Sequence, residues 1–180
     1  MNQLGFPLLS FIVFVPLAGA VWVWFFDEEN QAAIKGYALF VAGADFLLSL
    51  VLYFAWVNFE GMQFVDRFPW VSELGISFYL GVDGISLFFV LLTTLLTPLA
   101  ILASWQSITE QVKGYLFFML MLETGVLGVF ASIDLVLFYI FWEAMLVPTY
   151  FLIGRWGGER RAYAAFKFFL YTMAGSALML

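Results

Sequence analysis

The chain has 180 residues, of which 64% are hydrophobic and only 11% are charged, and apolar runs of about 20 residues recur along it. A soluble domain of this composition would precipitate, so the sequence indicates a membrane protein. The formal net charge of -6 comes from acids scattered along the chain, so it identifies no partner, and no basic surface for nucleic acid is present.

Hydropathy windows of about 19 residues predict about six helices long enough to cross a bilayer. The expected fold is therefore all-α, a polytopic transmembrane helix bundle that forms a single membrane domain over residues 1–180. The first segment lacks the basic start of a cleaved signal peptide and is too long for its apolar core, so we expect a retained helix. The predicted helices cover residues 4–26, 37–57, 84–104, 115–132, 134–154 and 162–180.

Short polar connections separate most of these helices and predict the orientation of the bundle. The first, third and fifth connections, DEENQAAIK, SITEQVK and RWGGERR, contain Lys35, Lys113 and three arginines, whereas the even connections contain only Arg67. Because Lys and Arg concentrate on the cytoplasmic side, the odd connections are predicted to be cytoplasmic and the amino terminus outside.

The connection over residues 58–83 is the only long one, and we expect it on the extracytoplasmic side. Its Phe68-Pro69-Trp70 step favours an interfacial turn followed by a short extended or amphipathic segment, and a strand hairpin fits equally well. At its end, Asp83 in GVDGIS is interpreted as the N-cap of the third helix.

Glu143 is the strongest candidate for a functional residue. It lies in the middle of the apolar run DLVLFYIFWEAMLVPTYFLIG, about 17 Å from the cytoplasmic end of its helix. A carboxylate at that depth costs about 2.5 to 3.5 kcal/mol on insertion scales, so it is rarely retained without a use. Pro148, five residues later, frees a backbone carbonyl nearby, although prolines also serve packing alone. We therefore expect Glu143 to handle a proton or an ion within the membrane.

Two further acids lie within predicted spans. Glu123, about 12 Å from the cytoplasmic end of the fourth helix, would lie at a depth comparable to that of Glu143. If the two face each other, the pair suits proton storage. A structural hydrogen bond explains Glu123 equally well. For Asp45, in the second helix, a structural role is favoured.

Lys167 lies about five residues inside the sixth predicted helix. Its long side chain could reach the cytoplasmic interface, so an anchoring role is as compatible with the sequence as a role in charge transfer. Arg155, Arg160 and Arg161 are interpreted as determinants of orientation, with anionic lipid as a weaker alternative.

The chain contains no Cys and no His. This excludes thiolate chemistry, haem ligation by His and the usual ligand sets for zinc and iron–sulfur clusters. We therefore expect no redox cofactor and no metal in this chain.

Three segments carry a specific resemblance. GVDGISLFFVLLTTLLTPLAILASW, LETGVLGVFASIDLVLFY and FYIFWEAMLVPTYFLIGRWGGERRAYAAFKFFLYT resemble the antiporter-like membrane subunit called chain M, or subunit 4, of proton-pumping NADH:quinone oxidoreductase, respiratory complex I. The resemblance covers residues 80–180, and the first two helices are similar only in hydropathy. Related chains occur in multisubunit cation/proton antiporters and membrane-bound hydrogenases.

The resemblance implies that these six helices are an incomplete part of a subunit of about fourteen helices, built around two inverted repeats. In the family, the acid at Glu143 pairs with a lysine on the seventh helix, outside this sequence, and Glu123 matches the acid position of the fourth helix in the proton path. Glu143 would take up a proton when the lysine moves away and release it when the pair re-forms. Lys167 stays a weaker candidate for this path.

The resemblance also implies the cellular setting. The expected partners are the other membrane-arm subunits and the lipid bilayer, and NAD, FMN, iron–sulfur clusters and quinone belong to partner subunits. The expected location is the bacterial inner membrane or an equivalent energy-transducing membrane. Two alternatives stay open: a subunit of a cation/proton antiporter or membrane-bound hydrogenase, and a truncated scaffold without activity.

Overall fold

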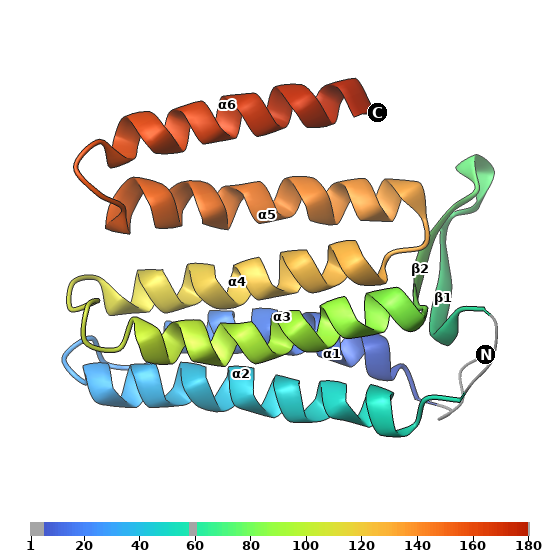
Figure 1. Ribbon diagram of the computed structural model, residues 1–180, viewed down its shortest axis with the longest axis horizontal. Coiled ribbons are helices and arrows are strands. Elements are labelled where there is room, and N and C mark those ends of the chain that lie inside the picture. Colours follow the sequence, from blue (N-terminus) through green and yellow to red (C-terminus); the bar gives the residue numbers. More distant parts are fainter. Residues whose placement is uncertain (1–5, 58–60, 180) are drawn as a thin grey trace.

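Six helices and one β-hairpin make up the structure, a computed structural model that describes residues 6–57 and 61–179 (Figure 1). The helical-bundle fold expected from the sequence is confirmed, and its one strand-containing element is the hairpin. The helices are α1 (Leu8–Val23), α2 (Gln31–Phe54), α3 (Gly84–Ala103), α4 (Val112–Ala131), α5 (Leu135–Trp156) and α6 (Arg161–Met179).

The helices run antiparallel in chain order, so the odd-numbered connections gather at one end of the bundle (Figure 1). Helix α4 is central, because it packs against α1 and α3 on one side and against α5 on the other, and α5 in turn contacts α6. One apolar cluster lies between α1, α2, α3 and α4, and a second joins the same helices to the hairpin and α5. α6 lies at the edge of the bundle and buries only Ala165 and Ser176 among its described residues.

Among the described residues, four helices are long and apolar enough to cross a bilayer: α2, α3, α4 and α5. Helix α1 has 16 described residues, about 24 Å at 1.5 Å per residue, which is shorter than the roughly 30 Å hydrocarbon core. The predicted helix covered residues 4–26, of which residues 4 and 5 lie outside the described residues. Among the described residues, α1 begins at Leu8 and ends at Val23, so it is shorter than predicted at both ends. α6 begins at Arg161 and carries Lys167, and it is less apolar than the other helices.

The second helix begins six residues earlier than the sequence predicts. Residues 31–36 are mostly polar or small and resemble a connection, yet the Asn30 side chain accepts a hydrogen bond from the Ala33 amide at 3.1 Å and caps them as the first turns of α2. α5 extends two residues further than predicted, to Trp156. There the Arg155 Nε donates to Gln111 Oε1 at 2.7 Å and the Trp156 indole donates to the Glu110 carbonyl at 3.1 Å.

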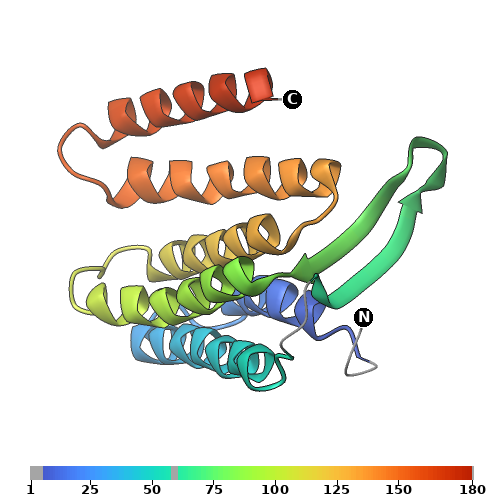
Figure 2. The same cartoon turned by 45° about the vertical axis from the view of Figure 1, so that its right-hand side comes forward.

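The long connection forms a β-hairpin, which is one of the two forms the sequence left open. Strands β1 (Gln63–Val71) and β2 (Ile76–Val82) pair antiparallel around the 3₁₀ turn η1 (Ser72–Leu74), and Gly75 takes the left-handed conformation at φ 70°. The hairpin projects from the end of the bundle (Figure 2). Residues 58–60 of the predicted connection lie outside the described residues.

Two acids fasten the hairpin to the helices. The amide and hydroxyl of Ser10, on α1, both donate to the Asp66 carboxylate of β1, at 2.9 and 2.8 Å. On the other strand, the Ser77 amide donates to Asp134 at 3.0 Å. The hairpin is therefore tied to both α1 and the start of α5.

Candidate functional site

Helix α5 places Glu143 in the membrane-spanning part of the bundle. Its N-cap, Asp134, accepts hydrogen bonds from the amides of Val136 and Leu137 at 2.9 and 3.1 Å. Pro148 lies inside the helix and has no N–H to offer the carbonyl one turn earlier, at Ala144. The Ala144 carbonyl, next to Glu143, therefore receives no hydrogen bond from residue 148.

The Glu143 side chain is directed to α6. It is half-buried, and its Oε1 accepts a hydrogen bond from the hydroxyl of Ser176, which is itself 4% exposed. Ser176 was not predicted as a site residue, because a serine among small and apolar residues gives no signal in the sequence. The structure therefore gives Glu143 a neutral hydroxyl partner across the α5–α6 contact.

The Glu123 side chain is directed toward α2 and α3. It is 2% exposed, and the acid that interacts with it electrostatically is Asp45 of α2, with the Thr97 hydroxyl of α3 also close to it. Asp45 is completely buried, at 0% exposure. The sequence favoured a structural role for Asp45, so its place beside Glu123 is a finding of the structure.

The two predicted site acids lie on adjacent helices but have different neighbours. Glu123 lies eleven residues from the start of α4 and Glu143 thirteen from the end of α5, or about 17 and 20 Å along the helices. Their depths are comparable, as expected. The two side chains have different neighbours, however: Glu143 accepts a hydrogen bond from Ser176 of α6, whereas the acid that acts electrostatically on Glu123 is Asp45 of α2. The arrangement in which Glu123 and Glu143 face each other is therefore not seen.

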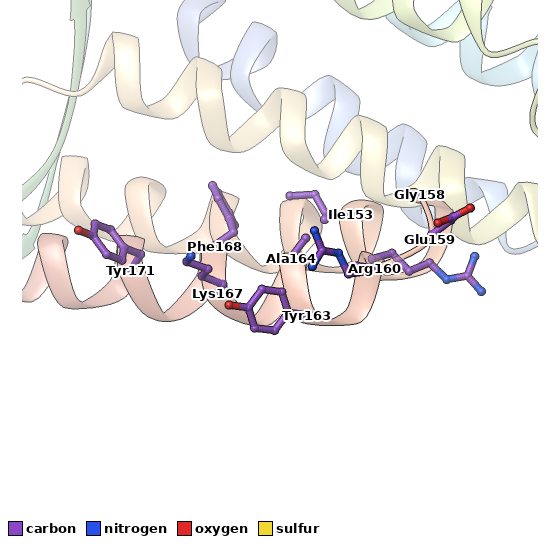
Figure 3. A pocket seen from close by; sticks show the side chains of 10 residues that line it. Ile153, Gly158, Glu159, Arg160, Tyr163, Ala164, Lys167, Phe168 and Tyr171 are labelled. Carbon is purple, nitrogen blue, oxygen red and sulfur yellow. The ribbon is translucent and has the colours of Figure 1, made fainter.

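Lys167 lies on the outer side of α6, where it is exposed (Figure 3). Its ammonium group is 5.9 Å from the centre of the Tyr163 ring, and together with Arg160 and Tyr171 it lines a shallow surface pocket. Among the described residues, its contacts include neither Glu143 nor Glu123. This position is compatible with the anchoring role.

The remaining acids at the helix ends act as caps. Asp83 accepts hydrogen bonds from the Ser86 and Ile85 amides at 2.7 and 3.1 Å, which confirms the predicted capping role. These bonds, chiefly that from the Ser86 amide, hold the pKa of Asp83 below its usual value. The Ser77 amide does the same to the pKa of Asp134. Both carboxylates are explained by structure alone.

Two family models match the chain. One, described as "NADH-ubiquinone oxidoreductase chain 4, amino terminus", matches residues 1–128, and the other, "NADH:quinone oxidoreductase/Mrp antiporter, TM", matches residues 132–180. The first match includes the first two helices, for which the sequence analysis found a similarity to the family only in hydropathy. The similarity therefore extends over both halves of the chain.

Curated relatives give the same result over almost the whole chain. "NADH-quinone oxidoreductase subunit M" of Rickettsia felis is 40% identical over 99% of this chain, and the protein of the same name from Rhodobacter capsulatus is 47% identical over 96%. The chain spans 37% and 34% of the length of these two relatives.

Solved structures with the same helix arrangement include two membrane complexes. A chain of respiratory complex I from Thermus thermophilus with bound NADH has a TM-score of 0.78 at 28% identity, with 93% of this chain and 33% of that chain covered. A chain of the Mrp complex from Dietzia sp. DQ12-45-1b has the same TM-score at 20% identity, covering 93% of this chain and 18% of that chain. At that identity, the second match shows a shared fold alone.

Proposed function

Because the chain belongs to the family of NADH-ubiquinone oxidoreductase chain 4, we propose that it serves in a proton-translocating membrane-arm subunit of an NADH-quinone oxidoreductase. The complete complex would couple electron transfer from NADH to quinone with proton pumping. The observation that carries the proposal within this chain is Glu143, a half-buried acid in the spanning helix α5. The antiporter alternative is not favoured, since the curated relatives carry the NADH-quinone oxidoreductase name and the Mrp likeness extends only to the fold.

In this proposal Glu143 takes up and releases a proton within the membrane. Its hydrogen bond to Ser176 orients the carboxyl group toward α6, and the carbonyl left free before Pro148 offers a neighbouring acceptor. The lysine expected to modulate its charge lies outside this sequence. Glu123 would be a second acid of the path and Lys167 a weaker candidate.

The proposal assigns all redox chemistry to partner subunits. With neither Cys nor His, this chain lacks the usual ligands of iron–sulfur clusters and the histidine ligands of haem. NAD, FMN, iron–sulfur clusters and quinone would therefore bind elsewhere, and the partners of this chain would be other membrane-arm subunits and lipid.

Orientation in the membrane follows from the basic residues. Of the seven Lys and Arg residues, five lie at the end of the bundle where α1–α2, α3–α4 and α5–α6 connect: Lys35, Lys113, Arg155, Arg160 and Arg161. Arg67 belongs to the hairpin at the opposite end. We place the end of the bundle that carries these five basic residues on the cytoplasmic side of a bacterial inner membrane, or on the equivalent side of another energy-transducing membrane. The hairpin and the amino terminus are then outside.

The test is proton pumping by the parent complex in sealed vesicles after Glu143→Gln. The amide keeps the shape and a hydrogen-bond acceptor for Ser176 but cannot carry a proton charge, so pumping should fall at least tenfold while the complex still assembles. Electron-transfer rate and assembly are measured on the same preparation. Glu159→Gln, the same change at an exposed residue between α5 and α6, is the matched control. Pumping at the control level in assembled Glu143→Gln complex would return Glu143 to a structural role.

A further inference from the structure

A second polar layer lies between α2, α3 and α4, apart from the contact of Glu143 with Ser176. Its members are buried side chains of three helices: Asp45 and Ser49 of α2, Thr94 and Thr97 of α3, and Glu123 of α4. The Ser49 and Thr94 hydroxyls form a hydrogen bond of 2.7 Å across the α2–α3 contact. Five polar side chains therefore share one buried region among spanning helices.

The hydroxyl groups of this layer have hydrogen-bond partners, whereas the carboxyl groups do not. Ser49 also donates to the Phe46 carbonyl at 2.7 Å. The Thr97 hydroxyl lies beside the Glu123 carboxyl group, but its hydrogen is directed to the Thr93 carbonyl at 3.1 Å. Among the described residues, none of the four carboxyl oxygens of Asp45 and Glu123 has a hydrogen-bond partner. Buried polar groups are nearly always paired, so each of these two carboxyl groups is expected to form a hydrogen bond.

Among the described residues, the basic residue of α2 does not act as a partner of the two acids. Lys35 is the basic residue of α2, but it lies ten residues from Asp45, about 15 Å along the helix, and its ammonium donates to the carbonyls of Trp105 and Ile108 at 2.7 Å each. Asp45 and Glu123 act on each other electrostatically. Two unneutralised carboxylates at this burial would repel each other with no solvent to screen them.

We propose that Asp45 and Glu123 form a carboxyl–carboxylate pair that binds one proton between α2 and α4. The carboxylic O–H of one residue donates to a carboxylate oxygen of the other, which leaves a single negative charge and gives both groups a hydrogen bond. A proton needs no coordination sphere. The described residues contain no group of three or more acids, His or Cys, which are the usual ligands of divalent metal ions.

This proton site is separate from Glu143, and it shares only Glu123 with the proposed proton path. It rests on the burial and the missing hydrogen bonds of the two acids, so it can hold whether or not the complex pumps protons. It also assigns Asp45 a role beyond the structural one that the sequence favoured.

The test is infrared difference spectroscopy of the purified parent complex in lipid nanodiscs. The C=O stretch of a protonated carboxyl group is compared between wild type, Asp45→Asn, Glu123→Gln and the double variant, in H₂O and D₂O. The double variant should lose the band of one protonated carboxyl per complex, and each single variant should shift or remove that same band. Glu73→Gln, an exposed acid of the hairpin turn, is the control and should leave the band unchanged.

Each contrary outcome is decisive. An unchanged spectrum in the double variant would mean that neither acid holds a proton. A band that responds to one substitution but not to the other would mean that a single acid holds the proton by itself. Either result would overturn the proposed pair. A band that disappears on adding sodium would make this a cation site. If the amide variants fail to assemble, Glu123→Asp and Asp45→Glu decide together, because each keeps both carboxyl groups. A band shifted by both changes supports the pair, and a band shifted by only one or by neither refutes it.

Discussion

The contact between α4 and α5 should be sensitive to a single methyl group at Gly125. A Cβ at this position would lie 2.8 Å from the Cβ of Met145, 3.2 Å from its Cα and 3.4 Å from its backbone nitrogen. Ordinary carbon–carbon contacts are about 3.5 to 4.0 Å. Because two of the three atoms belong to the backbone, rotating a side chain cannot relieve the contact, and Gly125→Ala must move α4 away from α5.

The magnitude follows from two opposing effects. Overpacking a well-packed contact costs about 1–3 kcal/mol, and the backbone clash places Gly125→Ala in the upper part of that range. Alanine gains about 1 kcal/mol over glycine within a helix. The net effect should be a loss of about 1–2 kcal/mol in the free energy of unfolding.

Gly43→Ala in α2 is the matched control, since a Cβ there meets nothing within 4 Å. It should keep the helix gain and stabilise the protein by up to about 1 kcal/mol. Both variants are compared with wild type as full-length fluorescent fusions, by the temperature at which the detergent-solubilised protein loses its monodisperse chromatographic peak. Equal midpoints for Gly125→Ala and Gly43→Ala would refute the close α4–α5 packing as a source of stability.

Two further predictions concern charges outside the spans. The hydrogen bond from the Ser77 amide lowers the pKa of Asp134, so the stabilisation by its charge is present above the unfolded value of about 3.9 and is lost as pH falls through the lower folded value. The thermal midpoints of wild type and Asp134→Asn should therefore differ at neutral pH and converge below about pH 4, and a constant difference would contradict this assignment. The Lys113–Glu28 ion pair, at 3.9 Å with Glu28 80% exposed, should contribute little. Glu28→Gln should change the unfolding free energy by less than about 0.5 kcal/mol, and a larger loss in thermal or denaturant unfolding would show an interaction not seen here.

Hydropathy predicted the helix bundle, because the presence of a spanning helix depends on the composition of a long segment. The ends of a helix depend instead on contacts of single side chains. The helix at 84–104 was placed within one residue of α3, since Asp83 signals its own cap in GVDGIS. The start of α2 was missed because Asn30 lies within a polar connection and only the structure shows its side chain bound to the Ala33 amide. Whether residues 58–83 form a hairpin depended on pairing between strands, which residue preferences alone do not determine.

The candidate site was predictable in part. An isolated acid in an apolar run marks Glu143 and Glu123, but the sequence does not say which way a side chain faces. The spacing of Asp45 and Ser49, four residues apart, and of Thr94 and Thr97, three apart, was the available signal that both helices present a polar stripe. That these stripes meet Glu123 follows from how α2, α3 and α4 pack, so it required the structure.

The packing of α4 against α5 also determines how the two acid sites relate. Asp45 and Glu123 lie on one side of α4, whereas Glu143 contacts Ser176 on the far side of α5. Across the same α4–α5 contact, Phe141 lies beside Gly128, where a Cβ would come within 2.2 Å of its ring. Helices α4 and α5 are therefore closely packed. If both sites bind protons as proposed, a change in the α4–α5 separation is the simplest way for one to influence the other.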